Sequence, residues 1–463
     1  MSQVKKRVLL LGGTGFVGRE LGVHLVRLGY ELVLLTRDPT KTTGSLPFPA
    51  EIHPWKGSPS EIPSNAMENI YAVVNLVGES IAGKAWSNKQ KKLILESRVS
   101  AVTSLTKAMA LNSQKPQVVI QASAVGFYGD RSEETLTEKS APGSNFLAQT
   151  CQAWEQESGS LALSGTRLVI LRLGMVLGLS GGALPELVGV YTKGLGATLG
   201  SGKQWMSWIH IQDLVSMIST ALSDPTWKGT FNATAPAPCR NEDFNTSLGK
   251  QGKYHFKKRV PKSMLVLALG EKAALVLDST KAIPEAAMNL GFVFKYPTLE
   301  SAFGDIFKDV RGKNVSYFQA AQWIPAPLSL VWEFFSNAHN LEKITPSWLS
   351  FQVKSVSTEK ITQGTQILYE LRLHGIPLGW KSVISQWEPN SLFVDEQLSG
   401  PYALWHHTHR FESLAGGTLI SDSVQYQLPL GTLGMLLGGW YVNWDVQKIF
   451  EHRRRAIPKL FKV

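Results

Sequence analysis

The chain has 463 residues, of which 43% are hydrophobic and 18% charged, and its formal net charge is +11. This length exceeds what one hydrophobic core usually serves, so we expect more than one domain. The basic residues lie in short separate clusters, which disfavours a nucleic-acid-binding protein. The two cysteines are too few for a disulfide framework, and we find no secretory signal or membrane-spanning run. The expected location is cytoplasmic.

A glycine-rich turn near the N-terminus follows an apolar strand, 8–11, and opens an amphipathic helix. Gly12, Gly15 and Gly18 fit the pattern G-x-x-G-x-x-G, and Gly13 extends the match to G-x-G-x-x-G. Glycine is needed because the backbone must bend tightly and approach a pyrophosphate, which the amides and dipole of the helix N-terminus hold. The strand, turn and helix together predict a dinucleotide site. A tight turn without a ligand is the alternative.

The end of the second strand indicates which dinucleotide is bound. Sites that prefer NAD usually have Asp or Glu here, about 20 residues after the glycines, to accept hydrogen bonds from the ribose 2′-hydroxyl. In this chain the strand 32–35 is followed by Thr36 and Arg37. A guanidinium and a hydroxyl suit a 2′-phosphate, which a carboxylate would repel. We therefore predict NADP(H). The alternative is that Arg37 is a solvated loop residue beside Asp38.

Strands and helices continue to alternate along the chain. The expected elements are strands at 72–78, 118–123 and 168–173 and helices at 88–112 and 147–163. This alternation predicts an α/β fold with a Rossmann-type doubly wound parallel sheet, which binds ligands at the carboxyl ends of its strands. Gly78, Ser123 and Gly174 lie at such ends.

Several separate motifs in this half resemble one known family. They are the glycine turn, Asn75–Glu79, Ser123–Gly129, Trp205–Asp213 and Phe231–Ala233. The chain is similar to the epimerase-family subgroup of atypical extended short-chain dehydrogenases/reductases. Members are labelled NAD-dependent epimerase/dehydratase-like or, historically, cell-division-inhibitor-like. The resemblance covers residues 1–308 and implies an NADP-binding domain that ends in a small substrate module.

Together with the turn chemistry, the resemblance implies a set of cofactor contacts spread over the strand ends. The expected NADP-binding residues are Gly12, Thr14, Gly15, Phe16, Val17, Gly18, Thr36, Arg37, Leu76, Gly78, Glu79, Ser123 and Leu173.

The catalytic pair of ordinary relatives is missing. They use a Ser and a Tyr-x-x-x-Lys pair, in which the Tyr exchanges the proton and the Lys makes its phenolate accessible. Counting back from Glu155, Cys151 takes the Lys place and Leu147 the Tyr place. The resemblance implies that this departure is typical of the subgroup. Ser123 and the nearby phenol Tyr128 are the catalytic candidates, although a Tyr packed at a strand exit is the commoner explanation.

Two polar residues further along also invite a catalytic interpretation. Asp213 directly precedes an apolar helical run, so we expect it to be a helix N-cap. His210 lies between two isoleucines, and a hydrogen-bonded structural role is favoured over a general base. Trp205 and Trp208 could face a substrate crevice or fill an interface, and the resemblance favours a structural hinge.

After a polar linker the chain changes character. A strand at 318–324 and an amphipathic helix within 326–341 are followed by strands near Phe351, Gln366, Lys381, Leu392, Trp405 and Thr418 and a final helix at 442–460. Residues 315–463 resemble the α+β helix-grip fold of the START-like, polyketide-cyclase and lipid-transport (SRPBCC) superfamily. The resemblance implies a ligand-binding domain.

One strand of this domain carries a run of histidines. Alternation puts His407 and His409 on one face with Trp405 and Phe411, and His406 on the other. With no Cys, Asp or Glu expected on that face, we predict no metal site. The face would line an apolar cavity. Alternatively, the cavity is filled by tryptophans, for which the candidates are Trp332, Trp348, Trp380, Trp387 and Trp440.

Three functions follow from these patterns. The first is an NADP(H)-dependent oxidoreductase or epimerase-like protein that acts on a small molecule, with an apolar or lipid-like ligand in the C-terminal domain. The second is an NADP-sensing protein without turnover, which the missing Tyr and Lys favour. The third is a lipid or isoprenoid carrier with the dinucleotide domain as a scaffold, which the intact cofactor motifs disfavour.

Overall fold

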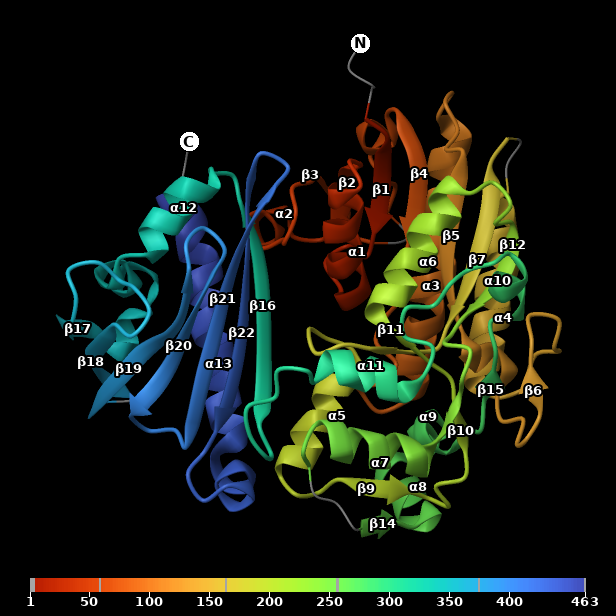
Figure 1. Ribbon diagram of the computed structural model, residues 1–463. Coiled ribbons are helices and arrows are strands. Elements are labelled where there is room, and N and C mark those ends of the chain that lie inside the picture. Colours follow the sequence, from red (N-terminus) through yellow and green to blue (C-terminus); the bar gives the residue numbers. More distant parts are fainter. Residues whose placement is uncertain (1–4, 58–59, 163–164, 255–257, 374, 462–463) are drawn as a thin grey trace.

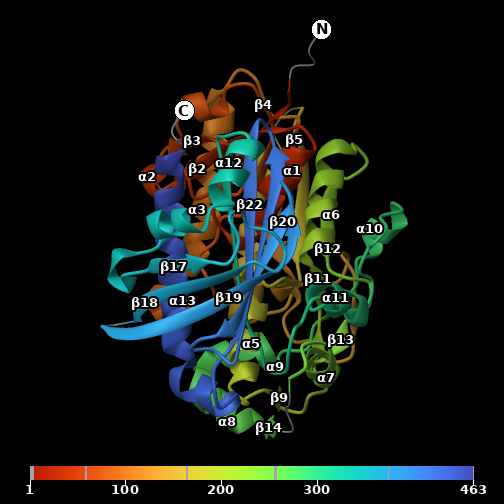
Figure 2. The same cartoon turned by 60° about the vertical axis from the view of Figure 1, so that its left-hand side comes forward.

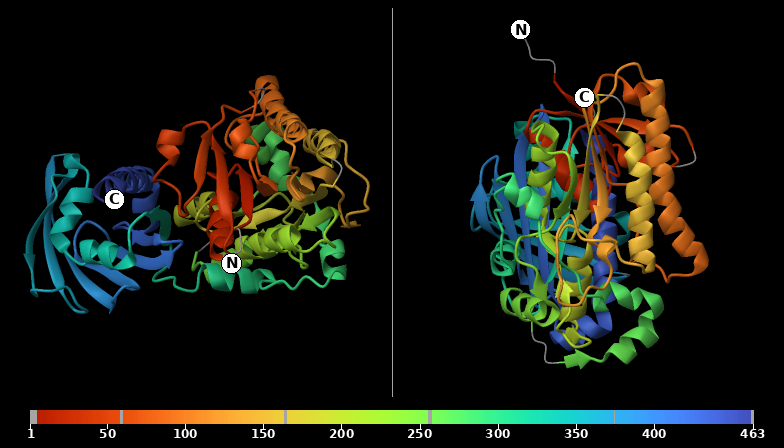
Figure 3. Two further views of the ribbon diagram at one scale, coloured as in Figure 1. Left: turned by 90° about the horizontal axis from the view of Figure 1, so that it is seen from above. Right: turned by 90° about the vertical axis from the view of Figure 1, so that its right-hand side faces the viewer.

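The computed structural model describes residues 5–57, 60–162, 165–254, 258–373 and 375–461. The chain forms two units that lie side by side, each built on a seven-stranded sheet (Figures 1 and 3).

The sheet of the N-terminal unit is parallel, in the order β12-β7-β5-β4-β1-β2-β3. Its strands are β1 (Arg7–Leu11), β2 (Glu31–Thr36), β3 (Glu51–Pro54), β4 (Ile70–Asn75), β5 (Val118–Ala124), β7 (Arg167–Leu173) and β12 (Gly229–Ala233). Most strands are apolar and buried on both faces, which is typical of parallel strands covered by helices. This confirms the predicted doubly wound α/β sheet.

Helices cover both faces of this sheet. The two central strands send alternate side chains into two separate apolar clusters, one under α1 (Phe16–Arg27) and α6 (Ile211–Ser223). The other lies under α3 (Asn88–Leu111) and α4 (Phe146–Ser158). The carboxyl ends of the strands are left open between these layers.

Smaller elements follow the carboxyl ends of the strands (Figure 1). They are α2 (Pro39–Thr42), β6 (Thr135–Leu136), β8 (Met175–Leu177), α5 (Ala183–Thr192), β9 (Ala197–Leu199), β10 (Trp205–Met206), β11 (Trp208–His210), β13 (Cys239–Arg240), α7 (Asn241–Gln251), β14 (Lys258–Val260), α8 (Lys262–Leu269), α9 (Ala274–Leu277), β15 (Lys281–Ala282), α10 (Glu285–Asn289) and α11 (Leu299–Ile306).

The sheet of the C-terminal unit is antiparallel, in the order β16-β22-β21-β20-β19-β18-β17. Its strands are β16 (Ser316–Ile324), β17 (Gln352–Val356), β18 (Gln366–Leu373), β19 (Ile376–Glu388), β20 (Leu392–Ser399), β21 (Leu404–Leu414) and β22 (Gly417–Gln427). A short helix, α12 (Leu328–Phe335), follows the first strand, and the long α13 (Thr432–Leu460) packs against the sheet (Figure 2). This confirms the predicted helix-grip arrangement, although α13 begins ten residues earlier than expected.

The two units share an interface that joins β16 and β22 to the first turns of the dinucleotide fold. The Trp323 amide donates to the Leu46 carbonyl at 2.7 Å. The Arg19 guanidinium donates to the carbonyls of Ser45 and Ala321, both at 2.9 Å. Leu419 of β22 is 4% exposed and belongs to the same apolar cluster as the underside of the parallel sheet. Packing therefore runs continuously from one unit into the other.

We expect Leu419→Ala to destabilise the full-length protein by about 2–5 kcal/mol, because it opens a cavity in this shared cluster. Arg27→Ala is the matched control. It removes an ion pair with Glu412 whose two side chains are 50% and 45% exposed, and such pairs contribute at most about 1 kcal/mol. Urea unfolding followed by circular dichroism measures both. Equal, small effects would contradict a packed interface.

Candidate functional site

The glycine turn is shaped by close backbone contacts. Gly12 has a φ of +80°, and a Cβ there would lie 2.9 Å from the Leu76 carbonyl, where β1 and β4 meet. A Cβ at Gly18 would lie 2.5 Å from the Gly12 carbonyl oxygen. Helix α1 begins at Phe16 with Gly15 as its N-cap, without a capping side chain or an acidic residue in its first turn. Its first amides are therefore free to bind an anion.

The end of β2 presents a cation beside this turn. Arg37 is exposed, and no hydrogen bond or ion pair joins its guanidinium to the described part of the chain. The neighbouring carboxylate of Asp38 instead accepts the Lys41 amide at 2.9 Å and caps α2. The Thr36 hydroxyl bonds Thr42 at 2.9 Å. The Arg37 guanidinium is thus free of an ion pair, which is the arrangement expected of a site for a 2′-phosphate.

The loop after β4 completes the rim of the predicted cofactor site. A Cβ on Gly78 would lie 2.9 Å from the Arg98 guanidinium carbon. That guanidinium donates to the Glu79 carbonyl at 3.1 Å and to the Ile94 carbonyl at 2.8 Å. Arg98 therefore holds the loop in place. The sequence analysis missed it, because nothing in the spacing along α3 marks it.

The remaining predicted cofactor residues lie around the same turn. Thr14 is exposed at its tip, and Val17 is half-buried in the first turn of α1. The Phe16 side chain faces the loop after β8, where a Cβ on Gly181 would lie 2.8 Å from the Phe16 Cβ. Leu173, at the end of β7, packs against the clusters on both faces of the sheet. The structure thus gathers the predicted residues at one edge of the sheet, while their contact with a cofactor stays a prediction.

A buried polar network lies at the carboxyl ends of β5, β7 and β12. The Ser123 hydroxyl donates to Glu155 at 2.6 Å. Glu155 in turn accepts two hydrogen bonds from Arg172, at 2.9 and 2.8 Å. Arg172 also donates to the Tyr128 hydroxyl at 2.9 Å, and Tyr128 donates to Asn232 at 2.7 Å. In the sequence, this network is indicated only by Arg172, a charged residue within an otherwise apolar strand, and it was not predicted.

The positions of the missing catalytic pair face this network. A Cβ on Gly126 would lie 3.4 Å from the Leu147 Cβ and 3.9 Å from the Cys151 sulfur. Burial raises the pKa of the Cys151 thiol to about 11, so the thiol is neutral at pH 7 and cannot replace a lysine cation. Tyr128 is fully buried, and burial raises its pKa. Its hydrogen bonds fit a phenol packed at a strand exit.

His210 and Asp213 have structural partners. The His210 ring accepts the Gln212 amide at 3.2 Å and is the N-cap of α6. Burial lowers its pKa to about 4, so it is neutral at pH 7. The prediction that Asp213 caps this helix was wrong, because Asp213 lies inside the first turn and accepts the amides of Lys295 and Tyr296 at 2.8 and 2.9 Å. It holds the segment that leads to α11.

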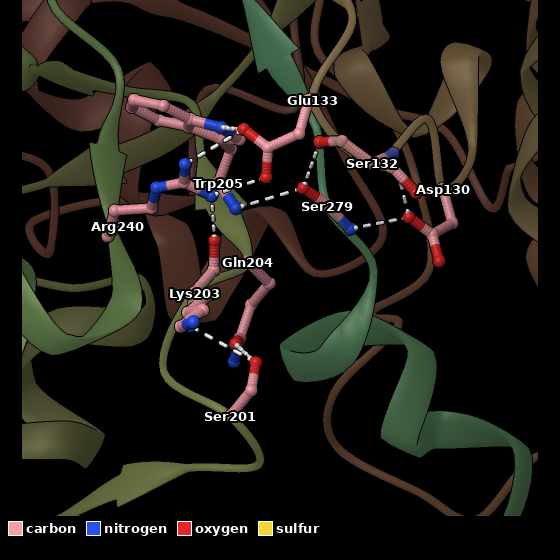
Figure 4. A network of polar contacts seen from close by, with 9 residues as sticks. All are labelled: Asp130, Ser132, Glu133, Ser201, Lys203, Gln204, Trp205, Arg240 and Ser279. Atoms are coloured by element: carbon pink, nitrogen blue, oxygen red, sulfur yellow. Dashed lines mark hydrogen bonds and ion pairs between the residues drawn. The ribbon is translucent and has the colours of Figure 1, made fainter.

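Trp205 and Trp208 are also structural. Trp208 is fully buried and donates to the Ala237 carbonyl at 3.1 Å. Trp205 donates to Glu133 at 3.0 Å, and its ring lies under the guanidinium of Arg240, 4.1 Å away (Figure 4). Ser279 joins the same network by accepting the Trp205 amide. The network connects the loop before β6 to β10, β13 and the segment before β15, while the hinge stays a prediction.

The C-terminal unit contains a cavity of about 60 Å³ between its sheet and its helices. His407 and His409 line it, as expected. Trp405 and Phe411 were expected to line it too, but neither does: Phe411 packs within the apolar cluster that surrounds the cavity, and Trp405 packs against a neighbouring cluster. Of the tryptophans proposed as filling, only Trp387 is among the lining residues.

A carboxylate meets these histidines, contrary to expectation. The His407 Nε2 and His409 Nδ1 atoms lie 2.9 and 2.8 Å from the same oxygen of Asp422, on the adjacent strand β22. The expectation failed because register across strands cannot be read from a single strand. The two imidazoles hold the pKa of Asp422 well below its usual range. The donor set could hold a cation, but the guanidinium of Arg453 also lines this cavity and would repel one.

Three family models match the chain. Residues 8–233 match the NAD dependent epimerase/dehydratase family, and residues 260–306 match a domain of unknown function, DUF1731. Residues 324–450 match the family described as polyketide cyclase / dehydrase and lipid transport. In the part of the chain that the structure describes, no helix is both long and apolar enough to cross a membrane.

Named relatives match the N-terminal two thirds. The epimerase family protein YfhF of Bacillus subtilis is 35% identical over 303 residues, which is 65% of this chain and 98% of YfhF. The chloroplastic SDR39U1 homolog of Arabidopsis thaliana is 37% identical over 311 residues, 65% of this chain and 86% of that protein. The crystal structure of human epimerase family protein SDR39U1 with NADPH superposes with a TM-score of 0.59 at 29% identity, covering 66% of this chain and all of that one.

We expect Glu155→Ala to destabilise the protein by about 3–5 kcal/mol, because it leaves the buried Arg172 charge unpaired. Glu157→Ala, two residues along the same helix, removes a carboxylate that accepts a hydrogen bond from the Thr103 hydroxyl at 2.6 Å and should cost far less. Thermal unfolding of the two variants gives the comparison. A Glu155 variant as stable as the Glu157 variant would contradict the network.

Proposed function

The chain belongs to the epimerase family, and on that premise we propose that its N-terminal unit binds NADP(H) and acts with it on a small molecule, as an atypical oxidoreductase or epimerase-like protein. The observation that carries the proposal is the unpaired Arg37 guanidinium beside a glycine turn whose helix amides are free. The NADPH in the human SDR39U1 structure supports the same choice of cofactor. Substrate would bind at the carboxyl ends of the strands, near Ser123.

In the same proposal the C-terminal unit holds an apolar molecule. The cavity is lined mainly by apolar side chains, with a smaller number of polar and charged groups among them. This composition is typical of small-molecule sites. The family match to polyketide cyclase / dehydrase and lipid transport proteins supports it.

A second candidate is a protein that binds NADP(H) without turning over a substrate. The observation in its favour is that Leu147 and a neutral Cys151 face the loop after Ser123. Neither side chain can pass a proton in the way that a Tyr and Lys pair does. The two candidates differ in turnover and agree on the cofactor.

We expect the unmutated protein to bind NADPH about ten- to a hundred-fold more tightly than NADH, since a 2′-phosphate clamp contributes about 1.5–3 kcal/mol. Arg37→Ala should remove this preference and leave NADH affinity unchanged. Lys5→Ala is the control, because it removes the same charge at the opposite end of the sheet, where Lys5 pairs with Glu31. Calorimetry measures both affinities, and equal affinities in the unmutated protein would refute NADP(H) preference.

Standard dehydrogenase and sugar-epimerase assays should show little turnover, because proton-transfer residues are replaced at 147 and 151. Ser123→Ala should then change activity less than expected for an ordinary relative. Tyr128→Phe tests the remaining phenol, with NADPH affinity as the check that the site is intact. A robust NADPH-dependent reductase activity that this variant abolishes, at unchanged NADPH affinity, would make Tyr128 the working acid.

A further inference from the structure

The cavity of the C-terminal unit contains a guanidinium that has no hydrogen-bond or ion-pair partner among the described residues, and whose carbon lies 5.1 Å from the centre of the Phe450 ring. Arg453 extends from α13 and lines the cavity. Its side chain makes no hydrogen bond within the described part of the chain, and its Nε is a buried donor without an acceptor. No carboxylate of the described residues forms an ion pair with the Arg453 guanidinium. Arg455, two residues further along α13, differs because it is exposed and pairs with Glu451.

The nearby carboxylates do not neutralise this charge by contact. Asp422 is engaged by His407 and His409. Asp395 also lines the cavity, and burial raises its pKa, which favours the neutral carboxyl. One of its oxygens is likewise buried without a hydrogen-bond donor. Leaving a cation and a carboxyl unsatisfied in a protein interior is costly, so such groups call for an explanation in ligand binding.

Apart from Asn337, Asn340 and Tyr369, the rest of the cavity wall is apolar. Ile367, Ile384, Trp387 and Phe393 from the sheet face Phe334 and Leu341 from the helical side. His409 stacks on Phe393 with ring centres 4.2 Å apart, so it joins the apolar wall to the polar groups. A molecule that fits this space therefore has an apolar body and a polar end.

We propose that this cavity binds an apolar carboxylic acid whose carboxylate pairs with Arg453. A guanidinium offers parallel donors that match the two carboxylate oxygens, and desolvation strengthens the pair. The proposal rests on the apolar-ligand function proposed above and adds the chemical class of the ligand.

The same geometry argues against a metal ion as the occupant. The His407, His409 and Asp422 ligand atoms lie within 4.8 Å of one another, and His407 and His409 each approach the Asp422 oxygen at hydrogen-bond distance. A divalent cation would have to replace both contacts. It would also stand in the field of the Arg453 cation, which already interacts with Asp422 electrostatically.

Isothermal titration calorimetry of the full-length protein with butanoic acid and 1-butanol tests the proposal. These two probes share a chain short enough for a cavity of about 60 Å³ and differ in the charged end. In the unmutated protein at neutral pH, butanoate should bind about ten- to a hundred-fold more tightly than butanol. Arg453→Gln should abolish that difference while butanol affinity is retained. Arg455→Gln removes an exposed, paired charge and should leave the difference intact.

Each outcome has a distinct meaning. Equal affinities for acid and alcohol in the unmutated protein, or an acid preference that survives Arg453→Gln, would overturn the assignment of the carboxylate and leave apolar binding standing. Failure of both the acid and the alcohol to bind would refute the apolar-ligand function itself. If Arg453→Gln does not fold, Arg453→Lys keeps the charge without the parallel donors and should reduce the acid preference. Stoichiometric zinc binding that His409→Ala abolishes, without acid preference, would establish the metal instead.

Discussion

The buried ion pair between Glu155 and Arg172 organises the carboxyl edge of the parallel sheet. Their side chains are 13% and 6% exposed and are joined by two hydrogen bonds. The pair connects α4 to β7, and through Ser123, Tyr128 and Asn232 it reaches β5 and β12. A charge at this depth is tolerated only when it is fully paired, so each partner depends on the others. The polar side chains of this network, at the edge where a substrate would bind, therefore already have hydrogen-bond partners within the protein.

This constraint explains why the loss of the Tyr and Lys pair does not disrupt the fold. In the positions of that pair, Leu147 and Cys151 pack beside Gly126 as ordinary small apolar contacts. The polar contacts of the strand ends go to Glu155 and Arg172 instead. The Rossmann scaffold can therefore keep its cofactor edge while its proton-transfer chemistry changes, since fold and chemistry are carried by different residues.

Local chemistry was predictable from the sequence, and contacts between distant strands were not. The glycine turn and the strand from Leu32 to Leu35 follow from backbone sterics and periodicity, which operate within a few residues. The contact of Asp422 with His407 depends instead on strand register across a hairpin, which no local pattern specifies. Asp213 was misplaced for a related reason. Sequence alone places a helix start only to within a residue or two. The helix begins earlier than expected, with His210 as its N-cap, so Asp213 lies inside the first turn.

Through the interface, the C-terminal unit contacts the segment that follows the predicted cofactor site. The segment after Arg37 forms α2 and then accepts hydrogen bonds from β16, where Trp323 donates to Leu46 and Gln322 donates to Gly44. On β22, Leu419 faces the N-terminal core while its neighbour Ile420 faces the interior of the helix-grip unit. Strand β22 thus packs with one face against the N-terminal core and with the other against the interior of the helix-grip unit. Because packed layers resist deformation, the strand end that carries Arg37 is held in place by both units.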